Sequence, residues 1–181
     1  DRAFRSGTLL SMERENRPIM GMPIEIAVAG DSPAARAALE DAFAYLVGVD
    51  ERFSTYKEGS EISRMNRGEL ALRNASEEVQ EIFARAEDAR KRTNGYFDVR
   101  RPDGKLDPSG IVKGWAIRKT AERIRNAGLE HFFVNAGGDI ASGGKNHEGA
   151  DWSVGIENPL NRAQIAKVVF PRGRGVATSG S

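Results

Sequence analysis

The hydrophobic pattern changes its period early in the chain, and this change limits the fold to one that combines strands with helices. Ile24, Ile26 and Val28 alternate with smaller or more polar residues, which predicts a strand with one wetter face. Asp31-Ser32-Pro33 follows and favours a helix start, because Pro suits the first helical turn. Apolar residues then recur at helical spacing, at Ala35, Ala38, Leu39, Phe43, Leu46 and Val47.

Two further helices are predicted downstream. One begins near Ser76, whose hydroxyl can cap the first free N–H groups, and ends at Asn94-Gly95. The other follows Asp107-Pro108-Ser109-Gly110 and closes at Gly128. The expected buried face of the first of these helices consists of Val79, Ile82, Phe83 and Ala86.

Strand patterns are interspersed with these helices. Residues 96–107 have the pattern of a hairpin that turns at Arg101-Pro102-Asp103-Gly104. Shorter patterns lie at 131–135, 152–156 and 165–170. Because no strict βαβ repeat is visible, the sequence predicts an α+β fold, with a mixed or antiparallel sheet and packed helices. The polar residues 1–19 are interpreted as an N-terminal arm or edge segment before a domain of residues 20–181.

Composition excludes several classes of protein. Of 181 residues, 39% are hydrophobic and 29% charged, which indicates one globular domain rather than a disordered chain. Lys and Arg number 27 against 26 Asp and Glu, so a nucleic-acid or polybasic membrane role has no support. No apolar run approaches the ~20 residues of a membrane span. The absence of Cys excludes disulfides, thiolate catalysis and Cys-ligated metals.

Two polar strings fall on predicted loops. Phe53-Ser54-Thr55-Tyr56, followed by Ser60, Ser63 and Asn66, suits hydrogen bonds to a polar ligand and stacking of a ring. A capped turn, in which the same side chains satisfy backbone groups, explains this string as well. In Thr93–Asp98, Asp98 can accept hydrogen bonds from a ring or ribose, or the string is a plain helix end that enters a hairpin.

Two glycine-containing strings complete the set. In Leu106–Ala116, the free N–H groups of a helix start and the Lys113 charge suit a phosphate or metal site, although an N-cap with a solvated Lys fits equally. In Val134–Ile140, two adjacent glycines permit close approach to a ligand, or a tight turn capped by Asn135 and Asp139. Neither string matches a P-loop or a dinucleotide-binding fingerprint.

The order of these motifs carries more information than any one of them. Met20-Gly21-Met22-Pro23 precedes them, and Ala177-Thr178-Ser179-Gly180 follows them at the end of the chain. This succession resembles the FAD:protein FMN transferase (ApbE-like) family. The resemblance runs from about Met20 to Ser181 and implies that family's flavin transferase fold.

The resemblance also implies a chemistry. Members of the family bind FAD with a divalent metal, usually Mg²⁺, and transfer FMN to a Thr or Ser of a target protein with release of AMP. Some relatives hydrolyse FAD to FMN and AMP instead. A non-catalytic flavin-binding module is the third alternative. The expected partners are therefore FAD and a flavin-acceptor protein.

The family's site residues are carried over by motif. Gly110 would provide a metal ligand through its backbone carbonyl, and no catalytic residue is assigned. The Asn135–Asp139 loop would shape the pocket. The residues expected to contact FAD are Met20, Tyr56, Tyr96, Phe97, Asp98, Asp107, Lys113, Ala177, Thr178 and Ser179.

The sequence departs from the family in three places. Pro108-Ser109 stands where members have Leu-Gly, and the loop from Asp98 to Asp107 is short, which can alter access for a protein target. Members continue beyond the position of Ser181 with a His before an Asp-Pro pair and with further metal ligands, so the domain is expected to be incomplete at its C-terminus.

Neither His replaces the missing one. His131 is expected to pack or hydrogen-bond beside Phe132 and Phe133, and His147 lies in an exposed turn. Asp139 and Glu157 are metal-ligand candidates only in principle. The resemblance favours a location in the cell envelope outside the cytoplasm, with the cytoplasm as the alternative. Any membrane association would come from an anchor not seen in the sequence.

Overall fold

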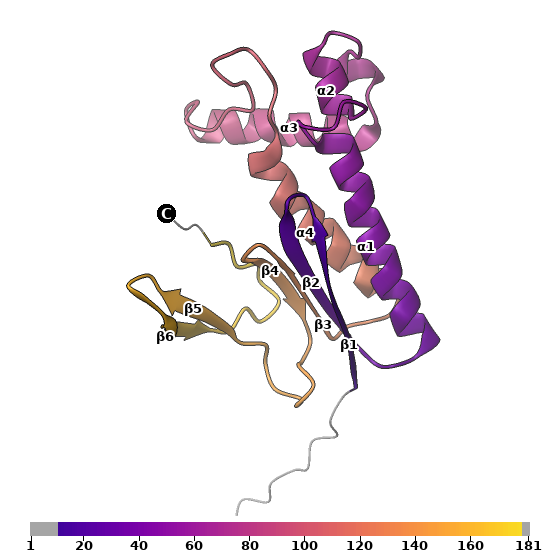
Figure 1. Ribbon diagram of the computed structural model, residues 1–181, viewed down its shortest axis with the longest axis vertical. Helices are drawn as coiled ribbons and strands as arrows, with labels where there is room; N and C mark the ends of the chain where they lie inside the picture. The colour runs from indigo at the N-terminus through magenta and orange to yellow at the C-terminus, as the bar shows by residue number, and fades with distance from the viewer. Residues whose placement is uncertain (1–10, 179–181) are drawn as a thin grey trace, which may run out of the picture. The chain divides into compact units, whose positions relative to one another are not determined.

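The computed structural model describes residues 11–178, and the chain divides into two compact units (Figure 1). Unit 1 consists of Asp1–Phe43 with Ile117–Ser181, and unit 2 of Ala44–Ala116. The boundaries fall inside two long helices, α1 (Pro33–Phe53) and α4 (Ser109–Asn126), so each helix contributes to both units. The boundary predicted after residue 19 stays a prediction.

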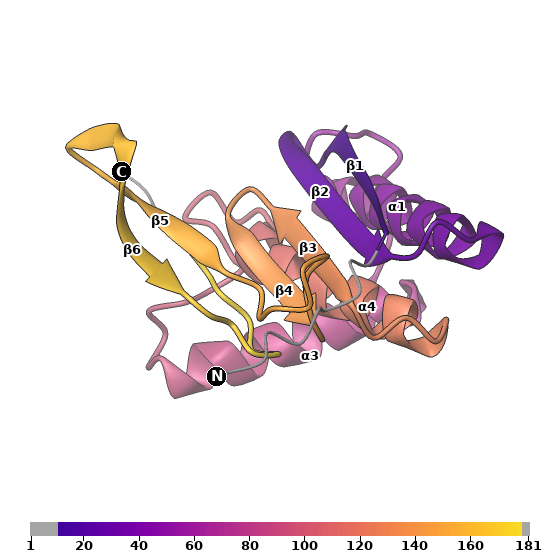
Figure 2. The ribbon, with the colours of Figure 1, turned by 90° about the horizontal axis from the view of Figure 1, so that it is seen from below.

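Unit 1 is built on a four-stranded antiparallel sheet of order β1-β2-β3-β4 (Figure 2). Its strands are β1 (Met12–Ile19), β2 (Met22–Ala29), β3 (Phe132–Ala136) and β4 (Asp139–Gly143). β2 is the predicted strand, and its side chains at Ile24, Ile26 and Val28 are fully buried. Residues 12–19, part of the segment expected as an arm or edge, form the edge strand β1, and neither β1 nor β4 was expected as a strand.

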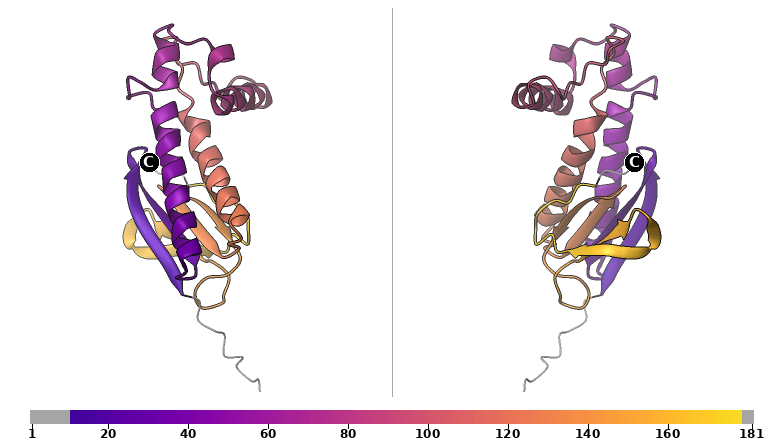
Figure 3. Two further views of the ribbon diagram at one scale, coloured as in Figure 1. Left: turned by 90° about the vertical axis from the view of Figure 1, so that its right-hand side faces the viewer. Right: turned by 90° about the vertical axis from the view of Figure 1, so that its left-hand side faces the viewer.

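The unit 1 parts of α1 and α4 lie on one face of this sheet (Figure 3). α1 begins at Pro33 as predicted, and the Ser32 hydroxyl accepts a hydrogen bond of 3.2 Å from the Ala35 N–H. The Arg17 guanidinium of β1 lies 4.3 Å from the centre of the Phe43 ring. The Arg125 guanidinium lies 4.8 Å from the Phe132 ring, which joins α4 to β3.

A second, two-stranded sheet in unit 1 consists of β5 (Val154–Asn158) and β6 (Asn161–Val169). Trp152 precedes it, stacks on Phe133 at 5.1 Å between ring centres, and donates its indole N–H to the Gly143 carbonyl at 2.9 Å. The strand patterns predicted near 131, 152 and 165 are therefore confirmed with shifts of a few residues at their ends.

Unit 2 is helical. Between the end of α1 and the start of α4 it contains α2 (Glu61–Asn66), the 3-10 helix η1 (Leu72–Asn74) and α3 (Glu77–Arg92). The Trp115 and Phe53 rings pack edge to face with their centres 5.7 Å apart. The Trp115 indole N–H donates a hydrogen bond to the Glu81 carboxylate at 3.0 Å. The residues buried in this unit include Leu46, Val49, Ile62, Val79, Ile82 and Val112.

Three local expectations need correction. The Ser76 hydroxyl does not cap α3: it is buried without a hydrogen-bond partner among the described residues, and the Glu61 carboxylate accepts the Ser76 N–H instead. Val47, expected on the buried stripe of α1, is 45% exposed. Residues 96–107 turn at 101–104 as predicted, but form a single bridge between Arg100 and Leu106 rather than two strands.

The antiparallel sheets with packed helices confirm the expected α+β class. Within residues 11–178, no helix has the length and apolar character needed to cross a membrane.

Candidate functional site

The hydroxyls of the loop before α2 are used to build the loop itself. Ser60 accepts the Ser63 N–H at 3.0 Å as the N-cap of α2, and its hydroxyl donates to the Ser54 carbonyl at 2.5 Å. Ser54 accepts the N–H groups of Tyr56 and Lys57 at 3.1 and 3.2 Å. The capped-turn interpretation therefore holds for these serines. Tyr56 differs, because its side chain is 95% exposed and remains open to a ligand.

Asn66, at the end of α2, fixes the backbone just before the α4 start. Its side-chain amide donates to the Leu106 carbonyl at 3.0 Å and accepts the Leu106 N–H at 2.7 Å. Both backbone groups of Leu106 are thereby satisfied by one side chain forty residues earlier. The sequence predicted that Asn66 contacts a ligand or belongs to a capped turn. In the structure it positions the segment that leads to Asp107.

The start of α4 carries three predicted site residues: Asp107 just before the helix, and Gly110 and Lys113 within its first two turns. The Asp107 carboxylate accepts the Ser109 N–H at 3.1 Å, and the Asp107 N–H donates to the Val99 carbonyl at 2.8 Å. The Phe97 ring lies against Gly110, where an added Cβ would be 3.2 Å from the ring. Lys113 follows Gly110 by three residues and is half-buried on the neighbouring turn of the helix.

The segment after α3 presents Tyr96, Phe97 and Asp98 on a fixed backbone. The helix ends in a left-handed pair, Asn94 at φ 52° and Gly95 at φ 83°. The Thr93 hydroxyl donates to the Ala89 carbonyl at 2.9 Å and accepts the Phe97 N–H at 3.0 Å. The Asp98 carboxylate accepts the Arg100 N–H at 2.8 Å, and Tyr96 is 96% exposed.

In unit 1 the structure joins two motifs that are forty residues apart. The Asn135 side chain accepts the Gly138 N–H at 3.0 Å, which forms the tight turn between β3 and β4. Thr178 then holds this turn from outside: its N–H donates to the Asp139 carboxylate at 3.1 Å, and its hydroxyl donates to the Gly138 carbonyl at 3.0 Å. Ala177 and Thr178 are exposed beside it, and Ser179 lies outside the described residues.

Met20 occupies the two-residue turn between β1 and β2. Met20 at φ 54° and Gly21 at φ 72° both adopt the left-handed conformation that such a hairpin requires. A Met in this conformation costs on the order of 1 kcal/mol relative to Gly. The geometry of the turn does not by itself favour a Met at this position. The assignment of Met20 as an FAD contact stays a prediction.

The described residues form no cluster of metal-ligating side chains. Across residues 11–178, no three His, Asp or Glu side chains come together as metal ligands. Mg²⁺ typically binds one or two carboxylates and retains water molecules. The Gly110 carbonyl, the one metal ligand that the resemblance implies, therefore has no cluster of carboxylates or imidazoles around it within residues 11–178.

The two histidines have the structural roles expected of them. His131 accepts the Lys145 N–H through Nδ1 at 2.9 Å. His147 lies in the exposed turn of residues 146–149, with its imidazole 3.8 Å from the Glu148 carboxylate.

The predicted site residues thus fall into two groups, each fixed locally. Unit 2 carries Tyr56, Tyr96, Phe97, Asp98, Asp107, Gly110 and Lys113, and unit 1 carries Met20, Ala177 and Thr178. The positioning roles of Asn66 and Thr93 were not predicted. Thr93 had a sequence signal, because a hydroxyl residue directly after a helix can bond the exposed carbonyls of its last turn.

Comparison with known proteins connects this arrangement to one family. An FAD:protein FMN transferase of Vibrio cholerae is 32% identical over 80 residues, which cover 44% of this chain and 24% of that protein. The FAD:protein FMN transferase of Haemophilus influenzae is 24% identical over 196 aligned positions, covering 78% of this chain and 57% of its own length. The chain therefore matches about a quarter of the length of the first relative and little more than half the length of the second.

The fold agrees with that of a solved structure. The flavin transferase ApbE from Vibrio cholerae superimposes with a TM-score of 0.83 at 22% identity, over 95% of this chain and 72% of that one. The sequence profile of the ApbE family matches residues 20–101 and 99–181, so that nearly the whole chain is covered. The chain belongs to the ApbE family.

Proposed function

We propose that the protein containing these residues is an FAD:protein FMN transferase that moves FMN from FAD to a Thr or Ser hydroxyl of another protein and releases AMP. Membership of the ApbE family and the flavin transferase activity of the relatives support this proposal. The observation in the chain that carries it is the α4 start, where Phe97 packs on Gly110 between Asp107 and Lys113.

The proposed reaction places specific demands on that helix start. The acceptor hydroxyl oxygen attacks the phosphorus of the FMN half, the P–O bond to AMP breaks, and the hydroxyl proton leaves to solvent or a base. Negative charge develops on the pyrophosphate as that bond breaks. The positive end of the α4 dipole and the Lys113 ammonium both favour such charge at this position.

We also propose Mg²⁺ dependence, with the Gly110 carbonyl as one ligand. A bound Mg²⁺ would supply Lewis-acid stabilisation of the phosphate oxygens. Its other ligands would be water and groups outside the described residues.

The test uses the longest available protein that contains this chain, incubated with FAD, Mg²⁺ and a Thr-containing acceptor protein. Mass spectrometry should show the acceptor gaining the mass of FMN minus water, with AMP in equal amount. Lys113→Ala should slow transfer roughly hundredfold, because a charge that stabilises the transition state is lost. Lys91→Ala on the exposed face of α3 is the matched control and should transfer at the normal rate.

Other outcomes distinguish the alternatives. AMP release at the same rate without acceptor would indicate an FAD pyrophosphatase and contradict protein modification. Tight FAD binding that chelators leave unchanged, with no turnover, would indicate a non-catalytic flavin-binding module. A melting temperature that FAD does not change would contradict the transferase, the pyrophosphatase and the flavin-binding module alike.

A further inference from the structure

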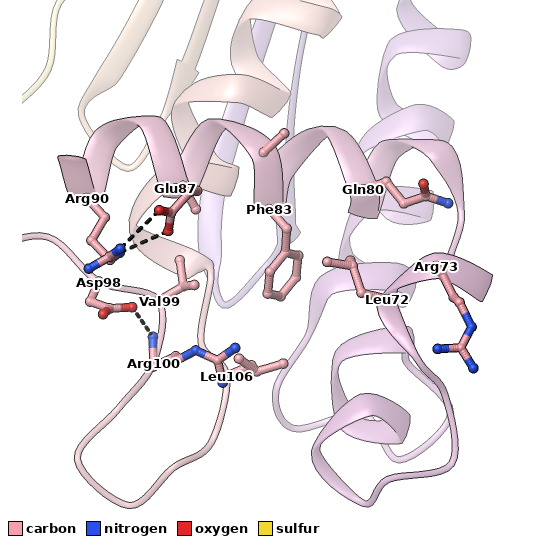
Figure 4. A pocket seen from close by; sticks show the side chains of 12 residues that line it. Leu72, Arg73, Gln80, Phe83, Glu87, Arg90, Asp98, Val99, Arg100 and Leu106 are labelled. Atoms are coloured by element: carbon pink, nitrogen blue, oxygen red, sulfur yellow. Dashed lines mark hydrogen bonds and ion pairs between the residues drawn. The ribbon is translucent and has the colours of Figure 1, made fainter. Parts of the chain in front are cut away.

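Unit 2 contains an open hollow of about 800 Å³, and of the residues that line it the predicted FAD contacts include only Asp98, at one end (Figure 4). It lies between α3, η1 and the short segment from Asp98 to Leu106. Its apolar surface comes from Leu72, Phe83, Val99 and Leu106. The Phe83 ring extends from α3 into the hollow, and the Leu72 side chain points toward that ring. Its volume is within the range of sites that take a ligand or a peptide side chain.

Two arginines at this hollow have charges that no side chain within residues 11–178 neutralises. Neither the Arg73 nor the Arg100 guanidinium has an ion-pair or hydrogen-bond partner among residues 11–178. Arg90, in the same hollow, provides the contrast, because the Glu87 carboxylate accepts two hydrogen bonds from it at 2.9 and 3.0 Å. Figure 4 places Arg73 and Arg100 on different sides of the apolar surface.

The segment that borders the hollow contains a short turn. The family profile matches in two stretches that overlap at residues 99–101, within the segment that borders the hollow. The alignment to the Haemophilus influenzae relative has 196 positions, more than the 181 residues of this chain, so that relative has residues with no counterpart here. Among residues 11–178, nothing covers the hollow beside the turn at 101–104.

We propose that this hollow binds an acidic segment of a partner protein, with one bulky apolar side chain inserted between Leu72 and Phe83 and flanking carboxylates paired with Arg73 and Arg100. Guanidinium groups bind carboxylates through two parallel hydrogen bonds, and the apolar surface stabilises an inserted side chain by burial. An extended segment suits the separation of the two arginines across the apolar surface, because its successive side chains reach both sides. The proposal does not depend on the transfer reaction.

The test selects random peptides displayed on phage against the full chain, with counter-selection against the Arg73→Glu/Arg100→Glu double variant. Enriched peptides should carry Asp or Glu on both sides of an aromatic or branched aliphatic residue. The best synthetic peptide should bind the wild type in calorimetry and lose roughly tenfold or more in affinity with either single Arg→Glu change. Raising the ionic strength should weaken binding, because the pairs are partly exposed.

Two further variants keep the result decisive. Ala84→Trp fills the hollow from the exposed side of α3 without changing charge and should also weaken binding. Arg64→Glu reverses an exposed charge of the same unit outside the hollow and should leave binding unchanged. Melting curves confirm that each variant is folded. Neutral or basic consensus peptides, equal binding to the double variant, or a peptide that Ala84→Trp leaves unaffected would each overturn the proposal.

Discussion

Two turns in this molecule are each held by one polar side chain forty residues away, and they differ in how much they depend on it. In unit 2, Asn66 satisfies both backbone groups of Leu106 ahead of the Gly110 turn. In unit 1, Thr178 bonds the Gly138 carbonyl from an exposed position. Gly110 has ordinary helical geometry, whereas Gly138 has φ 88°. The backbone at Leu106 therefore depends on the Asn66 side chain, whereas the turn at Gly138 depends on the glycine itself.

Gly138→Ala should have the largest effect. The left-handed backbone disfavours any side chain, and the new Cβ would overlap the Thr178 hydroxyl, so we expect a loss of about 3 kcal/mol in the free energy of unfolding. Denaturant titration measures it. Gly149→Ala is the control, since Gly149 has φ 75° with nothing within 4 Å of its Cβ, and it should lose only about 1 kcal/mol. Equal losses in the two variants would show that the Thr178 contact is unimportant.

Asn66→Ala should cost less, about 2 kcal/mol, because two partly buried backbone groups of Leu106 lose their partners and water can replace them only in part. Chemical denaturation and hydrogen exchange at the Leu106 N–H provide the measurement. Asn74→Ala in η1 removes an exposed side chain that makes no hydrogen bond within residues 11–178, and should change stability by no more than about 0.5 kcal/mol. Unchanged exchange at Leu106 would contradict the positioning role of Asn66.

Gly110→Ala should change stability by only about 1 kcal/mol or less, because gained helix propensity offsets the displacement of the Phe97 ring. If the α4 start contacts FAD, its affinity for FAD should fall roughly tenfold, measured by flavin fluorescence. Gly114→Ala on the same helix meets nothing within 4 Å and should stabilise the helix without changing FAD affinity. The same affinity loss in both variants would remove the assignment of Gly110.

The smallest effect concerns an exposed ion pair of unit 1. The Arg123 guanidinium donates two hydrogen bonds of 2.9 Å to Asp41 and lowers the pKa of that carboxyl below its usual value. The stabilisation is therefore present above the unfolded pKa of about 3.9 and is lost as the pH falls through the lower folded value. Solvent screening limits it to about 0.5 kcal/mol. Asp41→Asn should remove this part of the acid dependence of unfolding, and an identical profile would contradict the contribution.

The sequence predicted the helices and strands whose formation depends on one short segment. Pro33 and the spacing from Ala35 to Phe43 predict α1, and the alternation at Ile24, Ile26 and Val28 predicts β2, because helix and strand periods are properties of neighbouring residues. The capped-turn alternative for Ser60 was also available from the sequence and proved correct. β1 was not predicted, because an edge strand of alternating charges carries no clear apolar period.

The remaining features depend on contacts between distant segments. Sequence could not show that Glu61 rather than the Ser76 hydroxyl serves the start of α3, or that Phe97 packs on Gly110. The hollow between Leu72, Phe83 and Leu106 arises from three separate segments, so none of their local patterns reports it.

The sequence by itself determined the family, the class of fold and the motifs in order from Met20 to Thr178, because these are recorded in residue identity and spacing. Only the tertiary structure decided which polar side chains are already used by the backbone and which stay open. The Ser60 and Asn66 side chains donate hydrogen bonds to backbone carbonyls. The Tyr56, Arg73 and Arg100 side chains are exposed and accessible to a ligand. The physical reason is that a backbone N–H or carbonyl takes whichever partner the fold brings within about 3 Å, and that distance is set by packing rather than by spacing along the chain.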